Sequence, residues 1–294
     1  MTTIGTVIDR VFRQYLEPPS RQPATCYTST ALDSSQTDVT LVDFEVPEDE
    51  DLLRMGTTLE LGSEIVKVQT YTSTTGATII RREQLGTTAA THASGTAVKL
   101  APEYTRMDAL SASIENMMVL GAKLYTVRTD YLDFTDGAAS INDLAVSVVR
   151  FRPDGQPNQD LGELVEIVDY HPAIGGRAAV MPYNAPGYLT YRCRLGVPTD
   201  ETTTLDSLGM EAVWVPALMV GIAADMMVGR DIPEAQYEWI SQAIEAENVK
   251  YGSRLQLAGS LKGYQRLLIS EYVTEMNREY RPTVRMLNPF AQGR

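Results

Sequence analysis

Two strand-forming runs joined by a tight turn stand at residues 58–68, which read TLELGSEIVKV. Gly62 and Ser63 separate the runs, and a two-residue link that begins with glycine is typical of a β-hairpin. Further strands are predicted at residues 39–46, 78–80 and 96–100. Residues 20–102 therefore predict a small antiparallel β-module, either a barrel or a sandwich.

A second β-rich segment is predicted at residues 125–202, where β-branched and aromatic runs alternate with turn residues. The predicted strands cover residues 125–131, 144–151, 164–168, 178–181 and 188–195. Glycine occurs in each of the four breaks between them, as in Asp136-Gly137 and Gly175-Gly176. This spacing is typical of an antiparallel sandwich, here inserted between helical segments.

Helical periodicity frames both β-segments. Apolar residues recur every three or four positions in residues 4–16, 103–124 and 203–281. Pro18-Pro19 ends the first of these helices, and Pro216 suits the first turn of a later one.

These elements predict an α+β fold class, with a helical core of four to five helices and two antiparallel β insertions that are barrel-like or sandwich-like. The expected organisation is an N-terminal core helix at 1–19, a small β-module at 20–102, a core helix at 103–124, an inserted β-sandwich at 125–202, a C-terminal helical core at 203–282 and an extended tail at 283–294.

The composition excludes some functions and compartments. Of 294 residues, 44% are hydrophobic and 21% are charged, so disorder is not expected. The net charge of −13 disfavours nucleic-acid binding by the whole surface, although it leaves room for a local basic patch. The longest apolar stretch, residues 212–228, contains Pro216 and Asp225 and is shorter than the roughly 20 residues that a membrane span needs. With no signal peptide at the N-terminus, we expect no membrane association and assembly in the cytoplasm.

Charge is distributed unevenly along the chain. Nine acids and one base, Arg54, lie between Asp33 and Glu60, whereas residues 260–294 hold six bases and three acids. The acidic segment is either a solvated face or a surface that meets a basic partner. In a ring of like subunits, the acidic segment of one subunit could contact the basic segment of the next. Either segment could instead contact a different partner.

Residues that usually carry chemistry are few. His92 and His171 are expected in turns, and Cys26 and Cys193 are expected to remain unpaired thiols. No phosphate loop, metal-ligand spacing or nucleophile elbow is present. We therefore predict no catalytic residue, no cofactor and no metal site. A sugar-binding or hydrolytic site would need exposed aromatics, but packing between the sheets is expected instead for Tyr170, Tyr183, Tyr188 and Tyr191.

Two stretches resemble virion proteins of tailed bacteriophages. In residues 62–98, a strand with Glu64 and a strand ending in arginine precede the pattern Gly-Thr-Thr-Ala-Ala-x-His-Ala-x-Gly, which resembles a β-module of phage connector and tail proteins. In that pattern His92 would stabilise a turn. Residues 214–282, with WVPALMVG at 214–221 and a long final helix, resemble the helical core of head-to-tail adaptor (connector) proteins of long-tailed bacteriophages. Together the two stretches cover a little over a third of the chain, and residues 125–202 have no counterpart in the resemblance.

The resemblance implies a structural, non-enzymatic subunit of the virion at the head-tail junction. Such subunits form a ring, commonly of twelve, that docks on the portal protein, meets a downstream stopper or tail protein, and surrounds a channel through which DNA passes without sequence-specific binding. The C-terminal tail would reach the portal, with contact residues Arg278, Arg281, Arg285 and Phe290, unless it is a terminus without function. The alternative is another tail or baseplate structural protein, or less often a carbohydrate-binding or hydrolytic module. Tail-tube and baseplate proteins are mostly β, so the helical C-terminal half favours the adaptor.

Overall fold

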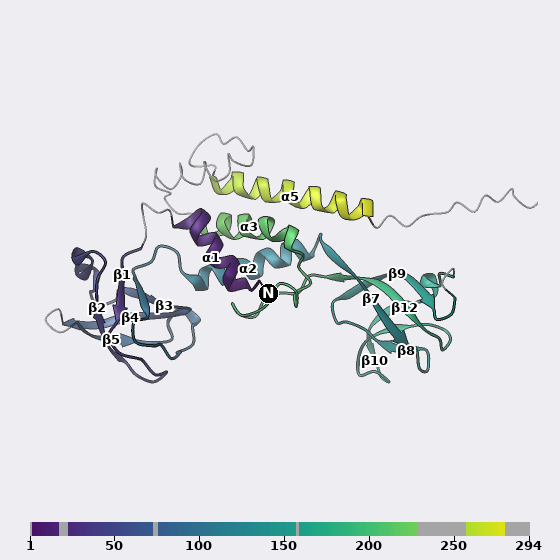
Figure 1. Cartoon of the computed structure of the whole chain (residues 1–294), viewed down its shortest axis with the longest axis horizontal. Coiled ribbons are helices and arrows are strands. Elements are labelled where there is room, and N and C mark those ends of the chain that lie inside the picture. The colour runs from purple at the N-terminus through teal and green to yellow at the C-terminus, as the bar shows by residue number, and fades with distance from the viewer. Residues whose placement is uncertain (1, 18–22, 73–75, 157–158, 229–256, 280–294) are drawn as a thin grey trace, which may run out of the picture.

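The computed structural model of the chain describes residues 2–17, 23–72, 76–156, 159–228 and 257–279. Its elements form an elongated arrangement in which a layer of helices separates two β-modules (Figure 1). The first β-module lies at one end of the long axis and the second lies at the other.

The helical layer joins segments that are distant in sequence. Its helices are α1 (Ile4–Val11), the π-helical η1 (Phe12–Leu16), α2 (Arg106–Gly121), the short η5 (Ala212–Trp214), α3 (Val215–Met227) and α5 (Leu257–Glu279). Thr3 and Thr105 cap α1 and α2, because each hydroxyl accepts a hydrogen bond from a backbone N–H of the first turn. Pro216 stands in the first turn of α3, as predicted. Of the helical segment predicted at 203–281, residues 229–256 and 280–281 lie outside the described residues.

The first β-module is a closed antiparallel barrel with strand order β1-β2-β5-β4-β3-β6. Its elements are β1 (Thr25–Thr28), β2 (Asp38–Val42), η2 (Pro47–Leu52), β3 (Thr58–Leu61), β4 (Glu64–Thr72), β5 (Ala77–Arg81), η3 (Gln84–Gly86) and β6 (Ala97–Leu100). The predicted hairpin is present: Leu61 pairs with Glu64 across Gly62, which has φ +60°. Strand β2 is shorter than predicted because Asp43 adopts φ +54°, which ends the extended backbone.

The second β-module consists of two three-stranded sheets, β10-β11-β8 and β7-β12-β9. Its elements are β7 (Tyr125–Asp133), β8 (Ala138–Ser140), β9 (Ala145–Pro153), η4 (Gly162–Leu164), β10 (Glu166–His171), β11 (Gly176–Val180) and β12 (Pro186–Arg194). A core that includes Phe134, Phe151, Leu189 and Tyr191 draws on both sheets, and the two phenylalanine rings meet edge to face at 5.3 Å.

The predicted fold class is wrong. Strand accounts for 33% of the chain and helix for 31%, so the protein is mostly β rather than a helical core with β insertions. Each β-module has a buried hydrophobic cluster of its own, separate from the cluster between the helices. The helical stripes were conspicuous in the sequence, whereas short strands such as β8 have too few residues to display alternation.

Candidate functional site

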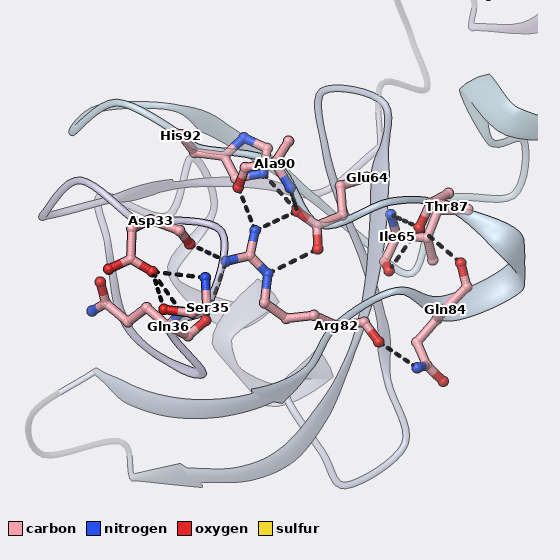
Figure 2. Close-up of polar contacts among 10 residues, drawn as sticks. All are labelled: Asp33, Ser35, Gln36, Glu64, Ile65, Arg82, Gln84, Thr87, Ala90 and His92. Carbon is pink, nitrogen blue, oxygen red and sulfur yellow. Dashed lines mark hydrogen bonds and ion pairs between the residues drawn. The ribbon is translucent and has the colours of Figure 1, made fainter.

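The barrel contains a buried ionic centre of Glu64, Arg82 and His92 (Figure 2). The Glu64 carboxylate accepts hydrogen bonds from Arg82 Nε at 2.9 Å and Nη2 at 2.5 Å, and from the backbone N–H of Ala90 at 3.1 Å. His92 Nε2 lies 2.8 Å from the same carboxylate. Burial opposes ionisation of Glu64, but these partners, Arg82 foremost, outweigh it and hold the pKa of Glu64 below its usual value.

This centre ties loops together rather than offering a reactive group. Arg82 also donates to the carbonyl oxygens of Asp33, Gln36 and Ala90, so one guanidinium joins two loops that are distant in sequence (Figure 2). The side chains of Glu64, Arg82 and His92 are 0%, 6% and 9% exposed. His92 therefore stabilises the loop, in agreement with the role that the resemblance implies.

The remaining candidates for chemistry are dispersed. His171 ends β10 in the other β-module, and its buried Nδ1 has no hydrogen-bond partner. Cys26 and Cys193 are free and buried in different clusters, as expected, and burial raises the pKa of the Cys26 thiol to about 12. Among the residues that the structure describes, no group of three or more His, Cys, Asp or Glu side chains is placed to hold a metal ion.

The sheet β7-β12-β9 has one face that is not used for packing between the sheets. Leu189, Tyr191 and Cys193 of the central strand point into the core, so the residues between them point outward. Pairing with β7 and β9 extends this outward face across all three strands. On β12, Tyr188 pairs with Tyr131 and Arg152, and Thr190 pairs with Thr129 and Arg150. Further along, Arg192 pairs with Val127 and Ser147, and Arg194 pairs with Tyr125.

We call this surface the arginine face, defined by Arg150, Arg152, Arg192 and Arg194 together with Tyr125, Tyr131 and Tyr188. None of its four arginines forms an ion pair with another described residue. Arg192 lies over the ring of Tyr125, with 4.4 Å between the guanidinium carbon and the ring centroid, and its buried Nε has no hydrogen-bond partner. Tyr131 and Tyr188 are about half exposed and meet edge to face at 5.1 Å.

Such a face does little for the stability of a single subunit. Arg150 and Arg152 project from the same side of β9, and Arg192 and Arg194 from the same side of β12, so like charges are adjacent, and none of the four is paired with an acid of the described residues. Arginine and tyrosine are also among the residues enriched at the energetic centres of protein interfaces. The exposed Arg152 and Arg194, beside the half-exposed Tyr131 and Tyr188, are therefore typical of an interaction surface.

A pocket of about 460 Å³ adjoins the arginine face. It is lined by Met117, Met118, Gly121, Ala122, Leu144, Arg194, Leu195, Gly196 and Val197. Met118 is 59% exposed at the rim, and Arg194 belongs to both surfaces. The arginine face therefore continues into an apolar hollow at the C-terminal end of α2.

The predicted contact residues fall largely outside the described part of the chain. Arg278 lies in α5, but its side chain is not described, and Arg281, Arg285 and Phe290 are outside the described residues. The contact of these four residues with the portal therefore stays a prediction.

The prediction for the four tyrosines is wrong for three of them. Tyr191 is buried and donates a hydrogen bond to Asp130, but Tyr170 is 67% exposed, Tyr188 52% and Tyr183 39%. Tyr188 is exposed because it is an odd number of positions from the core-facing Leu189 and Tyr191, so the pleat turns it outward.

The arginine face was missed in the sequence, although a signal was present. Residues 188–194 read YLTYRCR, and 150–152 read RFR, so each arginine is next to a core-facing residue. Recognising that alternation would have placed Arg150, Arg152, Arg192 and Arg194 together, provided that β9 was also known to be the neighbour of β12.

None of the helices that the structure describes has the length and unbroken apolar character that a bilayer crossing requires. Comparison of the sequence with protein-family models finds no matching family, and comparison with curated proteins finds no matching protein.

Proposed function

We propose that the protein is a structural subunit of the connector between the head and the tail of a tailed bacteriophage. In this proposal like subunits form a ring that docks on the portal protein and surrounds the channel through which DNA passes. The subunit contributes binding surfaces and performs no chemical step, and its place is the head-tail junction of the virion.

The observation that carries the proposal is the arginine face. Four arginines that form no ion pair with another described residue, and two half-exposed tyrosines, lie on the outer side of a sheet whose inner side packs in the core of the second β-module. The exposed Arg152 and Arg194 offer charge that complements an acidic protein surface, as expected of a subunit whose work is to contact neighbours. The similarity of residues 62–98 and 214–282 to connector proteins supplies the biological setting.

The overall charge also supports the proposal. A net charge of −13 repels phosphate at long range. A channel built from such subunits would let DNA pass without holding it, because binding to DNA is dominated by cationic contacts with the phosphates.

The test is the assembly state of the purified full-length chain. Sedimentation velocity and negative-stain electron microscopy over a range of concentrations, at low ionic strength, should reveal closed rings of uniform size. A chain that remains monomeric under all these conditions, and also after addition of the portal protein from the same genome, would overturn the proposal.

A second candidate is a structural protein of the tail or baseplate. Its support is the predominance of strand over helix, since this group of proteins is mostly β. Electron microscopy separates the two candidates. A connector subunit gives closed rings that bind portal protein, whereas a tail-tube subunit gives stacked rings or open tubes that do not.

A further inference from the structure

The barrel has an acidic surface whose chemistry complements the arginine face. The short helix η2 contains Glu48, Asp49, Glu50 and Asp51 in succession. Glu50 accepts a hydrogen bond from the Tyr71 hydroxyl at 2.7 Å. The carboxylates of the other three form no ion pair with any described residue. We call residues 46–55 the acidic ridge.

The acidic ridge also exposes apolar side chains. Met55 is 83% exposed, and Val46 and Leu52 are 48% and 41% exposed. Acids and apolar groups are thus mixed on the ridge, just as arginines and tyrosines are mixed on the arginine face. Each surface offers the other both opposite charge and apolar contact area.

We propose that the arginine face of one subunit docks on the acidic ridge of a second copy of the same chain. The barrel that carries the ridge and the sheet that carries the arginine face lie at opposite ends of the long axis, with the helices between them (Figure 1). The two surfaces therefore do not meet within one subunit. Contact between two different surfaces is heterologous, and it generates a ring where the rotation closes.

DNA is the rival occupant of the arginine face, because arginines bind phosphates and tyrosines stack on bases. The observations favour a second copy for two reasons. The chain carries a net charge of −13, so approach of a polyanion is opposed. In addition, the apolar members of the acidic ridge have no role in an open solvent face, but they match the exposed tyrosines.

The inference rests on the proposed function, because it names the contact through which the ring would form. It is tested with two charge-reversal variants of the full chain, each altered at exposed positions. The face variant is Arg152→Glu with Arg194→Glu, and the ridge variant is Glu48→Lys with Asp51→Lys. The control, Arg10→Glu with Arg13→Glu, makes the same charge change as the face variant on exposed positions of α1 and η1.

Each variant alone should assemble about 100-fold more weakly than wild type in sedimentation velocity, since the two reversed side chains then face charges of their own sign across the contact. The control should assemble as wild type does. An equimolar mixture of the face and ridge variants should recover assembly, because the introduced glutamates then face the introduced lysines in one contact, and the next contact joins two unaltered surfaces. One chain carrying all four substitutions should recover it as well. Unchanged circular dichroism and thermal midpoints establish that the variants are folded.

Three results would overturn the inference. Wild-type assembly by the face variant would place the subunit contact elsewhere while leaving the proposed function intact. Loss of assembly that neither the mixture nor the four-substitution chain restores would show that the two surfaces are not partners. Loss of duplex DNA binding in a mobility-shift experiment, with assembly unchanged, would assign the arginine face to DNA. Failure of the proposed function is distinct, since the wild-type chain would then not assemble at all.

Discussion

Gly221 of α3 lies so close to Gln265 of α5 that a Cβ on the glycine would stand 2.0 Å from Gln265 Nε2. The same Cβ would stand 2.1 Å from Asn116 Oδ1 of α2. Gln265 donates to Asn116 Oδ1 at 2.8 Å and to the carbonyl oxygen of Ala217 at 3.1 Å. The absence of a side chain at Gly221 thus allows a buried amide network to join three helices, and this network fixes how α5 docks.

Substitution Gly221→Ala should destabilise the fold by about 3 kcal/mol, because the added methyl group overlaps two buried amides and breaks the hydrogen bond between them. Chemical denaturation measures the loss. Gly263→Ala is the matched control within α5, where a Cβ meets nothing within 4 Å, and it should be neutral or stabilising by up to about 1 kcal/mol. Equal effects of the two substitutions would show that the network does not constrain the helices.

Substitution Glu64→Gln should destabilise the barrel by about 3 to 5 kcal/mol, because it leaves the Arg82 guanidinium buried without its carboxylate. The pKa of Glu64 is lowered from 4.5 on folding. Its stabilising contribution is therefore complete above the unfolded-state value, and it is lost as the pH falls through the lower folded-state pKa. Denaturation curves from pH 7 to pH 3 should show this acid-dependent loss in wild type but less of it in the variant. Identical pH profiles would contradict the assignment.

Glu60 has the opposite pH dependence. Burial raises its pKa from 4.5 to about 7, against the opposing effects of the Arg106 backbone N–H, Lys99 and the Arg106 side chain. Its Oε2 makes no hydrogen bond and lies 4.0 Å from Lys99 Nζ. The folded state binds the Glu60 proton more tightly than the unfolded state does. The contribution of Glu60 to the stability of the fold is therefore complete below pH 4.5 and is lost as the pH rises through about 7.

Substitution Glu60→Gln should therefore stabilise the fold by about 1 to 2 kcal/mol at pH 8 and have little effect at pH 5. The amide carbonyl retains the hydrogen bond from the Arg106 backbone N–H, which the carboxylate accepts at 2.5 Å. Urea titrations at the two pH values test this, and a variant less stable than wild type at pH 8 would refute it.

Deletion of residues 283–294 should leave the subunit folded and stop its docking on the portal. The prediction comes from the sequence, in which this segment contains Arg285 and Phe290 and lacks helical periodicity. The free energy of unfolding should change by less than about 1 kcal/mol, since terminal residues of a chain seldom contribute to its core. Pull-down with portal protein measures docking, and normal docking by the shortened chain would remove the tail from the portal contact.

Several elements could be predicted from the sequence because their signals are local. Pro216 marked the start of α3, and Gly62-Ser63 marked the β3–β4 hairpin. The role of His92 in a loop followed from a motif with its own turn glycines, although its partner Glu64 could not be derived, because the contact spans 28 positions.

The fold class and the arginine face required non-local information. Closure of the barrel depends on pairing of β1 with β6, and short strands do not reveal their partners in sequence. The arginine face depends on β9 lying beside β12, with bulges in the ladder that shift the register near Thr190 and Cys193. Pairing between strands that are distant in sequence determines both the fold class and the arginine face. The apolar periodicity of the helices is local, so the prediction gave the helices too much weight.

Native mass spectrometry of the equimolar mixture of face and ridge variants tests the central claim most directly. If subunits join arginine face to acidic ridge in a closed ring, every assembly must alternate the two variants, and the spectrum will contain only masses with equal numbers of each. Assemblies of one variant alone, assemblies of random composition, or monomers from a mixture of folded chains would contradict the claim that like subunits join through opposite ends of the molecule.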